Sequence, residues 1–192
     1  MVLDILLYDH PILRQKSAPV TDFGQNLKDL AKNLIDTLEH VGGLGLAAPQ
    51  IGVLLQVFII DLRNSGPNLD FLYDGKRASL HLFNPLVIIN PVLEILPSTE
   101  TTYAEGCLSL PDLRVNITRP THAKITFLDL NQKSHTLECK GYDGHCLQHE
   151  IDHLNGILFI DRAQPKELDK VKAKLKQLKR ATKDSLKKQS IN

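Results

Sequence analysis

Apolar residues recur every three or four positions over residues 27–41, which is the spacing of a helix that buries one face. We expect this helix to begin at Asp22, whose side chain can cap it, and to end at Gly42 and Gly43. The apolar stripe consists of Leu27, Leu30, Ala31, Leu34, Ile35, Leu38 and Val41.

The middle of the chain is richer in strand-forming patterns. Residues 54–61 should form a buried strand, and residues 123–130 and 134–140 should form a hairpin around a polar turn. Residues 80–105 read as extended segments. Because proline cannot donate to a strand ladder, Pro85, Pro91 and Pro97 favour edge strands and bends there.

Two more helices are expected towards the C-terminus. One covers about residues 142–155 and ends at Gly156, and the other is an amphipathic helix with apolar residues at helical spacing from Leu168 to Leu178. We further expect a polar loop over 63–79 and a short strand over 156–160.

The order of these elements lacks the alternation of strand and helix that builds parallel sheets. The pattern therefore predicts an α+β fold, with mainly antiparallel strands packed around a central helix over residues 142–155. The N-terminal helix and the C-terminal amphipathic helix complete it.

The length, charge and cysteine content of the chain indicate what kind of protein it is. The 192 residues suit one domain, and the net charge of +1 favours neither nucleic acid nor membrane as a partner. That balance hides a basic segment, because residues 165–192 carry ten Lys or Arg against three acidic residues, a charge of +7, and the rest carries −6. No membrane span or leader is apparent, and three cysteines suggest no disulfide framework, so we expect a cytoplasmic protein.

The strongest chemical signal is the motif His149-Glu150-Ile151-Asp152-His153. On a helix, His149 and His153 lie one turn apart on one face, where both imidazoles can bind one metal ion. Glu150 lies about 100° further round, beside the ion, which is the place for a general base. Two histidines and a glutamate also fall at this spacing on some solvated helices, so the motif alone leaves that alternative open.

A catalytic metal generally needs a third protein ligand. A histidine six residues after His153 would extend the motif, but Phe159 occupies that position. Glu167 is another candidate, although it lies at the start of the basic segment. The remaining strong option is Cys107 as a thiolate, where the neighbouring Gly106 permits close approach of the backbone.

Three stretches of the chain, residues 43–52, 105–109 and 148–156, resemble the three motifs of peptide deformylases in order and spacing. They read Gly-Leu-Gly-Leu-Ala-Ala-Pro-Gln-Ile-Gly, Glu-Gly-Cys-Leu-Ser and Gln-His-Glu-Ile-Asp-His-Leu-Asn-Gly. Residues 10–14 also look like the opening of that family. The resemblance covers about residues 5–162, and we expect a single catalytic domain over 1–164 to which the basic helix and tail of 165–192 belong.

The resemblance implies removal of the formyl group from the N-terminal formyl-methionine of nascent polypeptides, with release of formate. It also implies one divalent metal ion bound by Cys107, His149 and His153. Fe²⁺ is common in the family, and Zn²⁺, Ni²⁺ or Co²⁺ can occupy the site; ligand chemistry alone allows zinc or iron. By the same resemblance, the Gln50 side-chain amide and the Leu108 backbone N–H donate to the oxyanion, while Glu150 transfers protons.

Substrate contacts are expected from the glycine-rich motif and from the pocket beside the metal. These residues are Gly43, Leu44, Gly45, Gly106 and Cys146, although Cys146 is equally consistent with simple core packing. Asp143 and His145 depart from the usual family pattern, and they put the shape of the substrate pocket in question rather than the chemistry.

Other polar residues have structural readings. We expect Asp152 to anchor its helix, Glu105 and Arg119 to form a buried pair, and Cys139 to be structural. Most of the remaining histidines are expected on solvated surface; they are His10, His40, His81, His122 and His135.

Two other functions compete with deformylation. A zinc endopeptidase would need a different third ligand, and a ribosome- or RNA-binding protein with a structural metal would need neither Glu150 nor Gln50. The resemblance also implies that the basic C-terminal helix contacts the ribosome; the alternative is a solvated helix whose lysines confer solubility.

Overall fold

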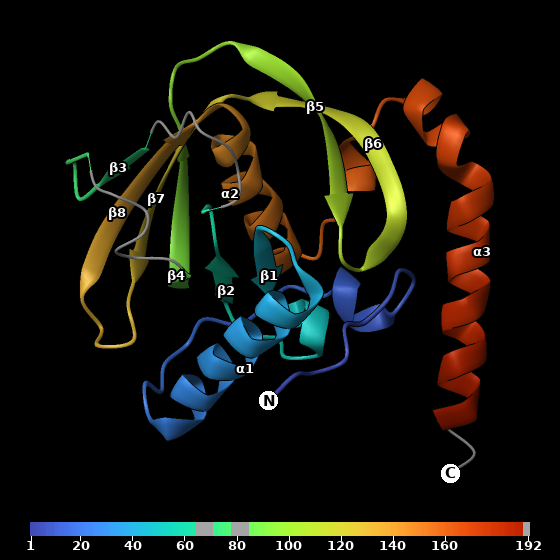
Figure 1. The fold of residues 1–192 in the computed structure, drawn as a ribbon, viewed down its shortest axis with the longest axis horizontal. Helices are drawn as coiled ribbons and strands as arrows, with labels where there is room; N and C mark the ends of the chain where they lie inside the picture. The colour runs from blue at the N-terminus through green and yellow to red at the C-terminus, as the bar shows by residue number, and fades with distance from the viewer. Residues whose placement is uncertain (64–70, 78–84, 190–192) are drawn as a thin grey trace.

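The computed structural model describes residues 1–63, 71–77 and 85–189. It is an α+β fold in which three α-helices accompany antiparallel strands (Figure 1). The α-helices are α1 (Gln25–Val41), α2 (Gly141–Leu154) and α3 (Pro165–Gln189), and short 3-10 helices are η1 (Pro11–Arg14), η2 (Ala48–Ile51) and η4 (Phe159–Arg162). The strands are β1 (Gly45–Ala47), β2 (Val57–Ile60), β3 (Phe71–Tyr73), β4 (Leu86–Ile95), β5 (Glu100–Cys107), β6 (Leu110–Pro120), β7 (His122–Leu128) and β8 (Ser134–Lys140).

The strands form two sheets. Six strands pair antiparallel in the order β1-β2-β4-β7-β8-β3, and β5 and β6 form a separate antiparallel pair. The predicted hairpin is confirmed as β7 and β8, where Phe127 lies opposite His135. In the described residues, no helix is long and apolar enough to cross a membrane.

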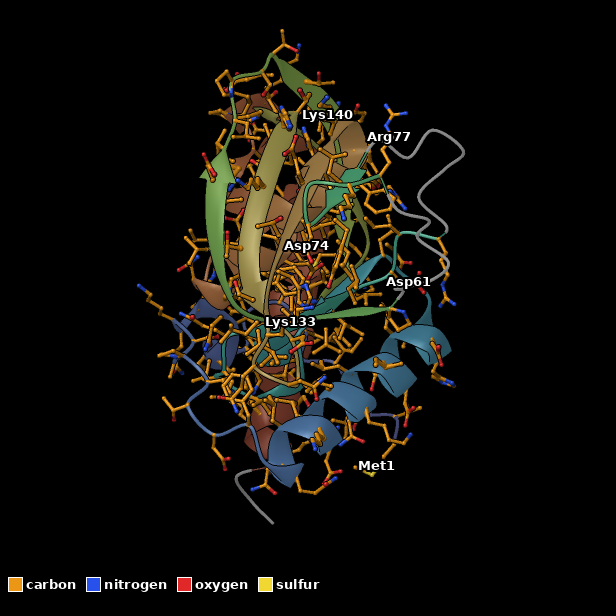
Figure 2. All side chains as sticks on the ribbon, turned by 90° about the vertical axis from the view of Figure 1, so that its left-hand side faces the viewer. Met1, Asp61, Asp74, Arg77, Lys133 and Lys140 are labelled. Carbon is orange, nitrogen blue, oxygen red and sulfur yellow. The ribbon has the colours of Figure 1, made fainter. Side chains whose placement is uncertain are left out.

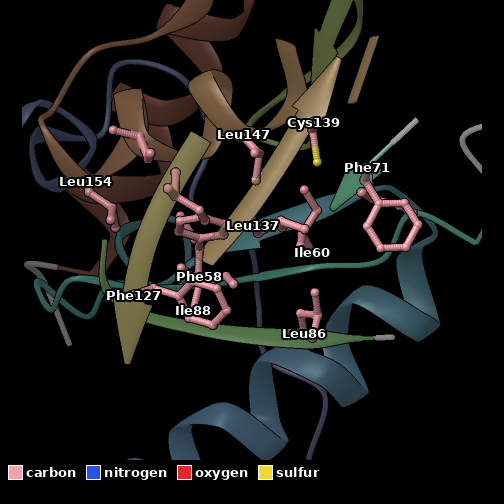
Figure 3. Packing of buried hydrophobic residues seen from close by; sticks show 14 residues of the cluster. Phe58, Ile60, Phe71, Leu86, Ile88, Phe127, Leu137, Cys139, Leu147 and Leu154 are labelled. Atoms are coloured by element: carbon pink, nitrogen blue, oxygen red, sulfur yellow. The ribbon is translucent and has the colours of Figure 1, made fainter. Parts of the chain in front are cut away.

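Strand β2 is buried on both faces, and this determines how the helices are placed. Phe58 and Ile60 belong to a core cluster that includes Leu147 of α2 (Figure 3). Val57 and Ile59 point the other way, into a cluster with Leu27, Leu34 and Leu38 of α1. Helices α1 and α2 therefore cover opposite faces of the sheet, which explains why β2 reads as a continuous apolar run.

Helix α3 packs along β6 at the side of the molecule (Figure 1). Leu178 is buried in a cluster with residues of β6 and η4, and Leu168, Val171 and Leu175 pack against the same cluster. The predicted amphipathic character of this helix is confirmed, because one apolar stripe faces the body and most lysines face outward.

The first helix begins later than expected. Helix α1 starts at Gln25 with Gly24 as its N-cap, and the Asp22 carboxylate instead accepts a hydrogen bond from the Gly24 N–H (2.8 Å). The predicted end is correct, because Gly42 adopts a φ of 74° and its N–H bonds to the Leu38 carbonyl (2.9 Å).

Within the described residues, the expectation of edge strands and bends over 80–105 holds for β5, which pairs only with β6, and for the second half of β4, where residues 92–95 pair only with β7. In the strand order β4 lies between β2 and β7, but it pairs with β2 only over residues 86–89, so Pro91 lies beyond the β2 pairing. The pairing with β7 shifts register between Ile89 and Val92, so Pro91 falls at a bulge where no ladder hydrogen bond is needed. The Asn90 side chain completes the bulge by bonding to both the N–H and the carbonyl of Val20 (each 2.8 Å).

Two more predictions need correction. Residues 71–73, expected within a polar loop, form β3 and pair with β8; residues 64–70 and 78–84, which include His81, lie outside the described residues. Residues 156–160 form no strand, because the chain turns at Gly156 (φ 71°) and continues into η4.

His135 is not a solvated residue. Its side chain is only 8% exposed, and its Nδ1 lies 2.8 Å from the Asp74 carboxylate, with the Asp129 carboxylate 3.5 Å from Nε2. Asp74 is labelled in Figure 2, which looks onto the side of the sheet where β3 and β8 lie. This contact ties the turn after β3 to β8.

Candidate metal and substrate site

Three side chains with metal-binding atoms come together between β5 and α2. Cys107 is the last residue of β5, at the tight turn into β6, while His149 and His153 lie one turn apart on α2. Their ligand atoms all lie within 4.8 Å of one another, and the Cys107 Sγ is 3.2 Å from the His153 Nε2. Ligands held at 2.0–2.3 Å from a tetrahedral ion are about 3.3–3.8 Å apart, so this group fits a divalent metal after small movements.

The donor set also suits a metal electronically. Burial disfavours the thiolate, but the neighbouring His153 and His149 hold the pKa of Cys107 well below its usual range. Burial similarly opposes the charged imidazole, yet contacts with Cys107 and Glu105 raise the pKa of His149. The Cys107 thiolate beside the two imidazoles therefore favours binding of a cation. A metal ion bound there would displace the protons on these three side chains.

Glu105 orients one of the histidines. Its Oε2 accepts a hydrogen bond from the His149 Nδ1 (3.1 Å), which leaves Nε2 of that ring directed to the metal group. Burial would favour the neutral acid, but hydrogen bonds from His145, His149 and Arg119 hold the pKa of Glu105 well below its usual range. The expected Glu105–Arg119 pair is present, with Arg119 Nε 2.6 Å from Glu105 Oε1.

Glu150 lies next to the metal group without belonging to it. Burial raises the pKa of Glu150 to about 7, because the carboxylate is removed from water. Its Oε2 is buried and has no hydrogen-bond partner among the described residues. A carboxyl group with a near-neutral pKa and a free oxygen is suited to accept and return a proton.

Gln50 approaches the same group from η2. Its Oε1 accepts from the Ala47 N–H (2.9 Å), which orients the amide so that Nε2 lies 3.5 Å from the Cys107 Sγ and 3.2 Å from the Ser109 Oγ. Leu108 lies in the turn that joins Cys107 to β6. The amide of Gln50 and the backbone of Leu108 thus lie beside the predicted third ligand.

A pocket of about 820 Å³ opens beside these groups. Its lining includes all of the residues that we predicted as substrate contacts, namely Gly43, Leu44, Gly45, Gly106 and Cys146. Cys146 also packs against the core cluster of Figure 3, which agrees with the core-packing reading of this residue; its contact with substrate stays a prediction.

Sequence reasoning did not assign Tyr142, Arg114 or Leu113 to this pocket, although they line it. Tyr142 could have been found, because it lies seven residues before His149 and shares its helix face with Cys146. His145, one of the two departures, also lines the pocket, and its ring stacks edge-on against Tyr103 (centroids 4.7 Å apart).

Two residues considered in the search for a third ligand have other contacts. Glu167 pairs with Lys170 at the start of α3, outside the metal group. Asp152, although part of the motif, pairs with Arg119 and Arg162, which agrees with its expected role as an anchor of the helix.

Comparison with known proteins identifies close relatives over almost the whole chain. The profile of the family described as Polypeptide deformylase matches residues 2–169. A peptide deformylase of Opitutus terrae is 40% identical over 190 residues, covering 97% of this chain and 98% of the relative. One of Brucella suis is 36% identical over 177 residues, covering 92% and 93%.

Solved structures show the same likeness. The peptide deformylase of Thermotoga maritima superposes with a TM-score of 0.73 at 33% identity, covering 86% of this chain and 99% of that one. A peptide deformylase of Plasmodium falciparum gives a TM-score of 0.81 at 31% identity, covering 94% and 98%.

Proposed function

This chain belongs to the polypeptide deformylase family, and from that premise we propose which of its residues carry out the reaction. The reaction is metal-dependent hydrolysis of the formyl group from the N-terminal formyl-methionine of nascent polypeptides, which releases formate. The site roles proposed below rest on one observation. Cys107, His149 and His153 converge at the edge of a pocket, and the unpaired oxygen of Glu150 lies next to them.

Cys107, His149 and His153 hold one divalent ion in this proposal. When bound, such an ion supplies a water whose pKa is lowered to roughly 7. We assign Fe²⁺ as the physiological metal, because it is common in the family that the motifs resemble; Zn²⁺, Ni²⁺ or Co²⁺ can take its place, since the ligand types accept them all. Glu105 fixes the tautomer of His149 by accepting its Nδ1–H.

Glu150 is the proton carrier of the reaction. It accepts a proton from the attacking water at its free oxygen and delivers it to the amine nitrogen as the C–N bond breaks. Formate then leaves with the oxygen of the water, and the peptide leaves with a free amino group. Burial in the pocket wall keeps this carboxyl in the pKa range where it can both take and give a proton.

Gln50 and Leu108 stabilise the negative charge that develops on the formyl oxygen. The Gln50 amide is held by the Ala47 N–H so that its nitrogen faces the site, and the Leu108 N–H lies in the adjacent turn. Gly43, Leu44, Gly45 and Gly106 form the walls along which the substrate backbone lies. Cys146 contributes to the pocket for the methionine side chain.

Cys107→Ser tests the metal assignment. A serine hydroxyl is far less acidic and harder than a thiol, so the variant should lose the metal or its activity. Metal content by atomic emission and formate release from a formyl-Met peptide are measured together on both proteins. A serine variant with full metal content and wild-type turnover would remove Cys107 from the site.

The catalytic domain is proposed to cover residues 1–164, and the basic helix and tail of 165–192 are proposed to belong to the same domain, because Leu178 of α3 is buried against β6. The outward face of α3 is proposed to contact ribosomal RNA, and the protein to work in the cytoplasm where nascent chains emerge. Lys172, Lys176, Lys183 and Lys187 are exposed on this helix and fall at helical spacing. Phosphate contacts of this kind weaken steeply with salt.

Replacing these four lysines with glutamine keeps the buried stripe of α3 intact. We expect unchanged turnover of a short formyl peptide and reduced co-sedimentation with ribosomes at low salt. Equal sedimentation of the variant and the wild-type protein would show that the lysines only solvate the helix.

A further inference from the structure

Four charged side chains connect the surface before α3 to a metal ligand. Arg162 lies in η4, Asp152 in α2, Arg119 in β6 and Glu105 in β5, and Glu105 bonds to His149. We call these four residues the charge network. Its members come from four elements, so the charge network connects α2 to β5, to β6 and to η4.

Each connection in the charge network is a direct hydrogen bond. Arg162 donates through Nε and Nη2 to the two oxygens of Asp152 (2.6 and 2.5 Å). Asp152 also accepts from the Arg119 Nη1 (2.7 Å). Arg119 then donates through Nε and Nη2 to the two oxygens of Glu105 (2.6 and 3.0 Å).

Three members of the charge network are buried, where an unpaired charge is costly. The side chains of Arg119, Asp152 and Glu105 are 3%, 7% and 5% exposed. Two buried carboxylates therefore share one buried guanidinium, and in the described part of the chain the histidines His145 and His149 face only one of them, Glu105 (3.5 and 3.1 Å). Within the charge network, Asp152 shares Arg119 with Glu105. Arg162, whose side chain is 43% exposed, supplies the second positive charge from the surface.

We propose that Arg162 is a positioning residue for deformylation, which neutralises Asp152 and so leaves the guanidinium of Arg119 aligned on Glu105. Without Arg162, Asp152 competes with Glu105 for Arg119. Glu105 then holds the His149 ring less firmly. This inference rests on the proposed role of His149 as a ligand. Arg162 itself does not line the pocket.

The chain offers a matched control. Arg14 makes a bidentate pair with Asp161, the residue next to Arg162, and the two side chains are 40% and 38% exposed. Within the described residues, the hydrogen bonds of this pair do not reach the charge network. Arg14→Gln therefore removes a surface guanidinium of similar exposure while leaving Asp152 and Arg119 paired.

The test compares wild type with Arg162→Gln, Arg162→Lys and Arg14→Gln. Each protein is loaded with zinc, and the first-order release of metal to excess chelator is followed at 25 °C. Cobalt-loaded samples give absorption spectra that report the ligand geometry. kcat and KM are measured separately on a formyl-Met peptide.

We expect Arg162→Gln to release metal about 3–10-fold faster than wild type, somewhat less than the loss typical for direct partners of metal ligands. Its cobalt spectrum should shift, and kcat should fall with KM unchanged. Arg162→Lys keeps the positive charge but cannot make two parallel hydrogen bonds to Asp152. Its metal release and kcat should therefore lie between those of wild type and Arg162→Gln. Arg14→Gln should match wild type in all three measurements.

The inference is overturned if Arg162→Gln matches Arg14→Gln in metal release and cobalt spectrum, even when its melting temperature is lower. If Arg162→Gln does not fold, Arg162→Lys is judged against Arg14→Gln by the same criterion. Failure of the proposed function would look different, because the wild-type protein itself would then bind no metal or release no formate.

Discussion

Gly45→Ala tests the position of Glu150 by a purely steric change. An added Cβ at Gly45 would lie 2.6 Å from the Glu150 Cδ, with Oε1 even closer. Ordinary contacts between carbon atoms are about 3.5–4.0 Å, so the carboxyl group must move by about 1 Å. The φ of Gly45 lies outside the left-handed region, so alanine adds no backbone strain that could account for a loss.

A displacement of this size has a large expected effect on catalysis. Misplacing a reacting group by about 1 Å costs on the order of 10²-fold in rate. The three atoms nearest the added methyl group all belong to Glu150 and none to a proposed metal ligand, so we expect the variant to retain its metal. We therefore expect kcat to fall by about 10²-fold, with metal content near one ion per chain.

The assay is formate release from a formyl-Met peptide, with metal content and melting temperature measured on the same samples. Gly24→Ala is the control, because the three atoms nearest an added Cβ at this helix cap all belong to the flexible Asp22 side chain (3.0 Å for the nearest). The control should keep wild-type activity. A Gly45→Ala enzyme with more than about a third of wild-type kcat would refute the placement of Glu150 against this glycine.

Two further predictions concern other contacts. Gln50→Ala removes a proposed oxyanion donor and should lower kcat by about 10²–10³-fold in steady-state assays; a change in KM alone would contradict that role. Asp74→Asn tests the buried contact with His135: burial opposes ionisation, but hydrogen bonds from His135 and Thr136 lower the pKa of Asp74. A carboxyl group whose pKa is lowered by folding stabilises the folded state at pH values above its pKa in the unfolded chain, and this stabilisation is lost as the pH falls through the pKa of the folded state. Asp74→Asn should therefore lower the melting temperature at pH 7, and the difference from wild type should shrink as the pH falls below about 4. A pH-independent difference would contradict this.

The sequence was most informative where one local pattern determined the structure. The spacing of His149 and His153 determined their shared helix face, and the apolar stripe of α3 determined which side of it is buried. The β7–β8 hairpin followed from two strand-like runs around a short polar turn. In each case, neighbouring residues alone carry the information.

The errors arose where distant residues decide the outcome. Pro91 falls at the bulge of β4, where the neighbouring Asn90 side chain bonds to Val20, 70 positions away. The buried His135 side chain pairs with Asp74, which lies 61 positions away in the turn after β3. No local pattern in the sequence reports either contact.

The metal group could be proposed from residue types and motif order, but its support could not. The connection from Glu105 through Arg119 to Asp152 and Arg162 requires β5, β6, α2 and η4 to meet in space. The sequence predicted the pair of Glu105 and Arg119 and the anchoring role of Asp152. The hydrogen bonds of Asp152 with Arg119 and Arg162 could not be predicted, because they depend on how these elements meet in the fold.

In the proposed site, three residues hold the metal while a fourth, Glu150, moves the proton. Metal stoichiometry and formate release, measured side by side on wild type and Glu150→Ala, test it most directly. We expect about one metal ion per chain in both proteins and formate release only by wild type. Turnover by Glu150→Ala above a few per cent of wild type, or loss of its metal, would contradict it.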